Sequence, residues 1–99
     1  MPIYVVLSNF TEKGREDIKN TSARLERLGP VADKLGVKVL ANAITMGQYD
    51  VVTMFDGPND EAIAQIIATV LSRGFVTTQT LRGFSVAEFK SVTDNVSAT

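Results

Sequence analysis

The sequence predicts an α+β domain in which strands and helical regions follow one another in the order β-α-β-β-α-β. Three observations predict it: three short apolar runs and a fourth, more polar run resemble strands, two longer segments carry apolar residues at helical spacing, and glycines stand at most junctions. Right-handed crossovers applied to this order give a four-stranded antiparallel sheet with helices on one face. The 99 residues suit one such domain.

The first strand is expected over residues 3–10, whose opening positions are apolar on both alternating faces, as in a strand buried from two sides. No basic region precedes this run, so it is interpreted as a strand and not as a signal peptide. Thr11 is expected to cap the helical region that follows. Apolar residues recur at helical spacing over residues 18–35, but Pro30 is expected to kink or divide the helix. Gly36 should end it.

The second and third strands are expected over residues 37–44 and 51–55. The first of these is half polar, with Lys38 and Asn42 on one alternating face, as in an edge strand. The run over 51–55 is nearly all apolar, which favours a central position in the sheet.

The second helix is expected to begin at Pro58, because proline suits the first helical position. Residues 63–71 then place apolar side chains at i, i+3, i+4, i+7 and i+8. Gly74 should end this helix.

The fourth strand, over residues 75–84, is the most polar and is expected at the other edge. Ser85 and Glu88 have the spacing of a capping box, which predicts a short last helix up to residue 90. From there the residues become small and polar. We therefore expect a domain over residues 1–90 and a flexible tail over 91–99.

The helices can cover only one face of the sheet, although the first and third strands are apolar on both faces. Some other surface must cover the second face. The simplest candidate is the same face of a second copy, which predicts a homodimer or a higher homo-oligomer.

Composition excludes several classes of function. The chain has no cysteine and no histidine, which excludes disulfides, thiol nucleophiles, zinc sites built on these residues and a haem held by a proximal histidine. We expect no metal and no cofactor. The net charge of −1 attracts neither nucleic acid nor an anionic membrane, and no apolar run is long enough to cross a bilayer. The lack of cysteine fits a cytoplasmic location.

The turn between the second and third strands, Thr45–Asp50, contains a first candidate site. Gly47 can reverse the chain there. Tyr49 and Asp50 could act as a catalytic pair, with the phenol as hydrogen-bond donor and the carboxylate as base. Turn chemistry explains the same residues without catalysis: Tyr49 would close the end of the core and Asp50 would accept backbone amides. Met46 and Met54 could contact an aromatic ligand, but methionine more often fills gaps in the core, and that is the expectation for both.

A second candidate site centres on Arg82 of the fourth strand, which faces the same way as two threonines of that strand. With Asn42 and Tyr49 it could line a pocket for a small organic ligand, and a carboxylate or phenolate would pair with the guanidinium. The alternative is a salt bridge at the surface or in a dimer interface.

The sequence resembles the GYD-domain family of small bacterial proteins, named for the motif Gly47-x-Tyr49-Asp50. The resemblance covers roughly residues 3 to 90. Gln48 stands where the family often has an acidic residue. The matching segments are Tyr4-Val5-Val6-Leu7, Phe10-Thr11 with Gly14, Arg24-Leu25-Glu26, Thr45–Asp50, Pro58-Asn59-Asp60-Glu61 and Thr80-Leu81-Arg82-Gly83-Phe84.

This resemblance implies a ferredoxin-like domain whose sheet packs against that of a second copy to form a dimeric α/β barrel. It implies no particular activity, since the wider relatives include cofactor-free monooxygenases, isomerases, haem-handling enzymes and small-molecule sensors. Three functions stay open. The first is a homo-oligomeric small-molecule-binding or regulatory domain, the second is a cofactor-independent monooxygenase or isomerase for a small aromatic or enolisable substrate, and the third is a purely structural subunit.

Overall fold

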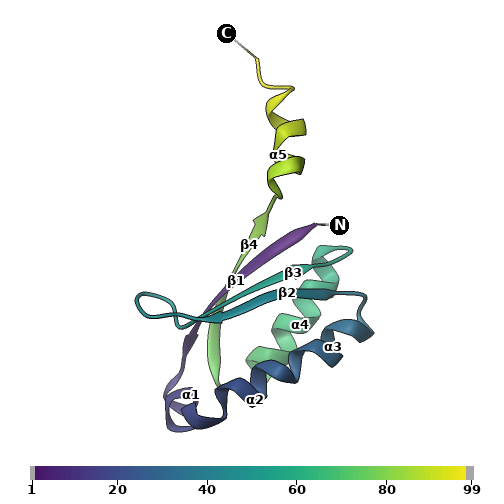
Figure 1. Ribbon diagram of the computed structural model, residues 1–99. Helices are drawn as coiled ribbons and strands as arrows, with labels where there is room; N and C mark the ends of the chain where they lie inside the picture. Colours follow the sequence, from purple (N-terminus) through teal and green to yellow (C-terminus); the bar gives the residue numbers. More distant parts are fainter. Residues whose placement is uncertain (1, 98–99) are drawn as a thin grey trace.

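The computed structural model describes residues 2–97 and contains one four-stranded sheet with helices (Figure 1). The strand order is β2-β3-β1-β4, and all neighbouring strands are antiparallel. The predicted α+β class, the antiparallel sheet and the central position of the first and third strands are confirmed. The strands are β1 (Ile3–Phe10), β2 (Lys38–Ile44), β3 (Val51–Asp56) and β4 (Val76–Gly83).

The first helical region is divided more often than expected. Thr11 caps it as predicted, since its side chain accepts the Gly14 amide proton at 3.1 Å. The break nearest to Pro30 lies at Arg27, three residues upstream. Proline is tolerated in the first turn of the next helix, where amides have no intrahelical acceptor. The pieces are α1 (Glu12–Glu16), the 3-10 helix η1 (Ile18–Asn20), α2 (Thr21–Glu26) and α3 (Leu28–Lys34).

The second helix, α4 (Asp60–Ser72), is continuous and begins two residues later than expected. Asn59 is its N-cap, because the side-chain oxygen accepts the Ala62 amide proton at 2.9 Å, so Pro58 precedes the cap and is not the first helical residue. Gly74, with a φ of 79°, follows the helix in the left-handed conformation that glycine adopts easily.

The core lies between the sheet and the helices α2 to α4. Alternate residues of the central strands point into it, among them Tyr4, Val6 and Phe55, and α4 contributes Ile63 and Ile66. Figure 1 shows α1 to α4 on the same side of the sheet. The other alternate residues of the strands form the surface that we call the open face. The register assigns to it Ile3, Val5, Leu7, Asn9, Lys38, Ala41, Ala43, Val52, Met54, Asp56, Thr77, Gln79, Leu81 and Gly83.

A bulge in β2 changes which residues face the core. The register shifts between Val39 and Ala41, and Asn42 then pairs with Thr53, a buried residue of the core side. Lys38 pairs with Asp56 on the open side. The expectation that Lys38 and Asn42 share one face is therefore wrong, because one extra residue in the strand reverses the alternation.

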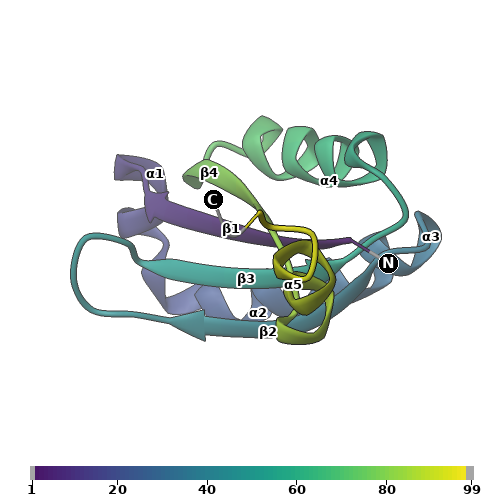
Figure 2. The same ribbon diagram turned by 90° about the horizontal axis from the view of Figure 1, so that it is seen from above.

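The last helix, α5 (Val86–Thr93), leaves the sheet on the side opposite to α1 to α4 (Figures 1 and 2). The predicted capping box of Ser85 and Glu88 is present. The helix continues to Thr93, three residues beyond the expected end, while positions 98 and 99 of the predicted tail lie outside the described residues. The radius of gyration is 15.3 Å, above the ~13 Å of a compact chain of this length, because α5 projects.

Candidate functional site

Asp50 holds the end of the sheet together. Its carboxylate accepts the Phe10 amide proton at 2.9 Å, and its own amide donates to the Ser8 carbonyl at 2.9 Å. Its carbonyl accepts the Thr45 amide proton at 2.8 Å. These three bonds extend the β1–β3 pairing beyond Val51 and close the turn, so the carboxylate already serves a backbone donor.

Tyr49 belongs to a different environment from its neighbour. Its hydroxyl group donates to Gln79 Oε1 at 3.1 Å, and its carbonyl accepts from the Thr45 hydroxyl at 2.5 Å. Gln79 pairs with Leu7 on the open face, so the tyrosine reaches from the β2–β3 loop to β4 on that side of the sheet. Tyr49 and Asp50 therefore bind different partners.

Asn42 and Arg82 stand on the two edge strands, β2 and β4, with β3 and β1 between them. Strand spacing puts these edges roughly 14 Å apart. The amide oxygen of Asn42 accepts from the Thr53 hydroxyl at 2.6 Å. A single chain thus does not bring Asn42, Tyr49 and Arg82 into one pocket.

Arg82 lines a groove of about 460 Å³ between α4 and β4, a volume within the range of small-ligand sites. The groove has a polar end and an apolar floor. Arg82, Thr80, Tyr4 and Asp60 provide its polar groups, and α4 contributes Ile63, Ala64, Ile67, Ala68 and Leu71. Its make-up is that of a site for a small amphipathic molecule.

The polar end of the groove contains a pair that sequence reasoning missed. The hydroxyl of Tyr4, a residue only 4% exposed, donates to the Asp60 carboxylate. This hydrogen bond raises the pKa of Tyr4, burial and the nearby carboxylate charge raise it further, and Arg82 lowers it. The sequence pattern indicated for Asp60 only a role at the helix start. The two partners are 56 positions apart in the sequence, so no local pattern signals the pair.

Arg82 is available to an anion. Its guanidinium carbon lies 4.4 Å from the centre of the Phe84 ring and 5.8 Å from that of Tyr4, and one of its nitrogens donates to the Gly83 carbonyl. Within the described part of the chain it forms no ion pair with a carboxylate. A ligand carboxylate could therefore supply one.

A second cavity, of about 90 Å³, lies between the sheet and α2 and α4. Its lining is mostly apolar and also includes Ser8, Thr21, Arg24, Thr53, Arg73 and Thr78. It is smaller than the ~150 Å³ engineered cavity that admits benzene. Residues 2–97 contain no group of three carboxylates placed to hold a metal ion. None of the helices in the same range is long and apolar enough to span a membrane.

These features define a class: a small α+β protein with one open apolar sheet face, a projecting helix and a shallow groove beside Arg82. Which family the chain belongs to follows from a comparison of its sequence. The model of the GYD domain matches residues 4–93, and the chain belongs to this family.

The chain is also similar to a protein of Thermus thermophilus called glutamine synthetase and cystathionine beta-lyase binding protein. The two are 30% identical over 89 residues, which span 89% of this chain and 94% of that protein. The match therefore extends over nearly the whole of both.

Proposed function

We propose that this protein is a homo-oligomeric regulatory protein that acts by binding a metabolic enzyme. The observation that carries this proposal is the similarity, over nearly the full length of both chains, to a protein named for binding glutamine synthetase and cystathionine beta-lyase. The open face and the exposed apolar residues of α5 support it, since uncovered apolar surface of this kind commonly marks protein interfaces. A cytoplasmic location belongs to the same proposal.

Direct binding tests this proposal. The purified chain is immobilised, and glutamine synthetase and cystathionine beta-lyase of its own source organism are passed over it, with an unrelated oligomeric enzyme as control. We expect saturable binding of at least one of the two at micromolar concentration and none of the control. Lack of saturable binding by both would contradict the proposed partner class.

The proposed oligomer is a dimer of ferredoxin-like subunits whose open faces pack together into an α/β barrel. This arrangement is supported by Val5, Leu7, Val52 and Met54 on the two central strands, which are half buried because no helix within residues 2–97 packs over their face of the sheet. A charge in the middle of that face should then prevent association.

Sedimentation velocity separates this arrangement from others. Val5→Glu should convert the dimer into a folded monomer, and Gln65→Glu, which adds the same charge on the exposed side of α4, should leave it dimeric. Circular dichroism checks that both variants fold. A Val5→Glu protein that folds and remains dimeric would place the interface elsewhere.

The α4–β4 groove supports a second candidate, a small amphipathic effector that carries a carboxylate. Arg82 would pair with the carboxylate, while the apolar floor of α4 would contact the hydrocarbon part. Amide NMR titration with hexanoate and benzoate tests this candidate. We expect shifts at Thr80 and Ile67 that Arg82→Ala removes and Arg73→Ala leaves in place. Equal binding by the Arg82→Ala protein would exclude Arg82 from the site.

The catalytic alternative has less support. In a cofactor-independent monooxygenase or isomerase, Asp50 would be the base and Tyr49 the hydrogen-bond donor. In the structure Asp50 Oδ2 accepts the Phe10 amide proton and Tyr49 donates to Gln79, so both side chains already have a role in holding the fold. A purely structural oligomer would leave the groove beside Arg82 without a ligand. The binding and titration experiments above distinguish both alternatives from the proposed function.

A further inference from the structure

We infer that α5 is an exchange arm that packs against a second copy of this chain, so that each subunit holds the other through its last helix. This inference rests on the proposed homo-oligomer and extends it, because it assigns part of the interface to a segment outside the sheet. The arm is the segment from Phe84 to Val96.

The arm stands clear of its own subunit. In both ribbon views it extends from the end of β4 on the side of the open face (Figures 1 and 2). None of its residues belongs to the core cluster. The Phe89 ring meets the ring of Phe84, which is itself part of the arm, at a centroid distance of 6.2 Å. The arm therefore lacks the tertiary packing that normally stabilises a helix of eight residues.

One side of the arm is an apolar stripe. Val86, Phe89 and Val92 recur at a spacing of three, which places them along one side of α5. Val86 is 92% exposed and Phe89 is 51% exposed. The opposite side carries Ser91 and the ion pair of Lys90 with Asp94, at 3.2 Å. This amphipathic pattern is typical of a helix that packs against another surface.

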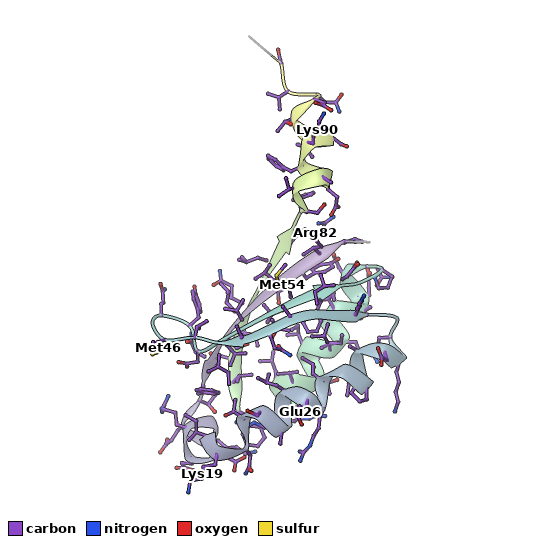
Figure 3. The ribbon with its side chains drawn as sticks, viewed as in Figure 1. Lys19, Glu26, Met46, Met54, Arg82 and Lys90 are labelled. Atoms are coloured by element: carbon purple, nitrogen blue, oxygen red, sulfur yellow. The ribbon has the colours of Figure 1, made fainter. Side chains whose placement is uncertain are left out.

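The geometry of the connection keeps the arm away from its own sheet. Two residues, Phe84 and Ser85, join β4 to α5, and the capping box of Ser85 with Glu88 fixes the first turn of the helix. Arg82 stacks on Phe84 at 4.4 Å just before this connection, at the upper end of β4 (Figure 3). The apolar stripe therefore projects beyond the sheet, to where another molecule can reach it.

Interface area indicates that a second copy is the occupant. Four strands of six to eight residues present roughly 19 by 23 Å, or about 440 Å², which is below the ~600 to 1,000 Å² per partner of a stable interface. An arm of this length covers roughly 120 Å² on the other copy and buries as much of itself. Reciprocal exchange of two arms brings the interface into the range of stable dimers.

Charge supports the same occupant. The open face is uncharged apart from Lys38 and Asp56, which stand opposite each other at one corner, and the apolar stripe has no charge. Neither surface is complementary to nucleic acid or to an anionic membrane. Both surfaces therefore suit an apolar partner, and in a symmetric pair the second copy supplies one for the open face and one for the arm.

Photo-crosslinking tests the position of the arm in the full chain. p-Benzoylphenylalanine is incorporated at position 89 in unlabelled protein, which is mixed with 15N-labelled wild type, allowed to exchange and irradiated. We expect crosslinked peptides that join the unlabelled arm to the labelled copy. The inference is overturned if the crosslinks stay within one chain, or if no crosslinks form in a sample that sedimentation shows to be mixed dimer. Either result leaves the proposed oligomer in place.

A charge scan measures how much the arm contributes. Phe89→Glu with Val92→Glu should raise the dimer dissociation constant roughly 100-fold or more, as expected for apolar side chains removed from an interface. Ser91→Glu, on the polar side, should leave it within a factor of about three. If the wild type, the double variant and the Ser91→Glu variant have equal dissociation constants, the inference about the arm is wrong and the proposed dimer is unaffected. A wild type that stays monomeric at millimolar concentration would remove the proposed oligomer as well.

Discussion

The two faces of the sheet differ in what covers them. On one face, Phe55, Val6 and Tyr4 are almost fully buried under the helices. On the other, the adjacent residues Met54 and Val5 are only half buried, and Leu81 is 42% exposed. The same sheet thus supplies a finished core on one side and an uncovered apolar surface on the other. Only the first side is explained by the fold of the single chain.

The difference indicates which parts of the molecule are free to serve a function. The covered face holds the residues that keep the domain folded, and the groove beside α4 lies at its margin. The open face and the α5 arm contribute little to the fold of one subunit, yet they carry exposed apolar side chains. Apolar residues that do not stabilise the monomer are best explained by association.

The largest expected effect comes from truncating neighbours on opposite faces of β3. Phe55→Ala should lower the free energy of unfolding by about 3 to 5 kcal/mol, because it leaves a cavity in the core. Met54→Ala, measured in the Val5→Glu background, should cost about 1 kcal/mol or less. Urea denaturation measures both.

Repeating both measurements at several protein concentrations tests whether Met54 and Phe55 differ in this way. In the otherwise wild-type chain, the cost of Met54→Ala should grow as concentration rises, because association buries that side chain. The cost of Phe55→Ala should not change with protein concentration. If Met54→Ala costs as much as Phe55→Ala at every concentration, the two faces are equivalent within one subunit and the contrast fails.

How far the sequence predicts this molecule depends on how local each signal is. The central position of β1 and β3 follows from strands that are apolar on both faces, and the cap at Thr11 and the capping box at Ser85 follow from short motifs. No short motif predicts the bulge near Leu40, because the pairing of β2 with β3 determines it. Met46 and Met54 were both expected to fill the core, but Met46 is 101% exposed at the tip of a loop (Figure 3) and Met54 is half buried on the open face. The apolar character of a side chain does not tell which of these positions it takes.

The candidate site was predicted less well than the fold. Arg82 lines a groove, as a ligand-binding residue would, but its neighbours there include Tyr4 and Asp60, which are brought together only by the packing of α4 on the sheet. Asn42 faces the core because of the bulge. Long-range contacts of this kind follow from topology and register, which a single sequence specifies only indirectly.

A smaller effect is expected at alkaline pH and tests the covered face. The raised pKa of Tyr4 means that its neutral form is stabilised in the folded protein, so this contribution is complete below the ordinary tyrosine pKa of about 10 and is lost as pH rises through the folded value. The wild type should therefore lose thermal stability above pH ~10 more steeply than Tyr4→Phe does.

Scanning calorimetry between about pH 8 and 11 measures this difference, with Tyr49→Phe as the control because Tyr49 stands on the open side. The control should lose stability as steeply as the wild type. Parallel curves for wild type and Tyr4→Phe would show that the hydrogen bond to Asp60 contributes nothing to folding.

The smallest effect is expected at acid pH and tests the open side. Hydrogen bonds from the Ser85 amide and hydroxyl lower the pKa of Glu88, so the capping box stabilises α5 above the ordinary carboxyl pKa of about 4.3 and is lost as pH falls through the folded value. Because α5 lies outside the core, acid should fray this helix and leave the sheet intact.

Ser85→Ala should fray α5 already at neutral pH, at a local cost of about 1 kcal/mol. In the monomeric Val5→Glu variant, where no second copy holds α5, amide hydrogen exchange followed residue by residue between about pH 3 and 6 should show lost protection in α5 and unchanged protection in β1. Simultaneous loss in both elements would mean that the arm is part of the folded subunit and not an appendage available to a second copy.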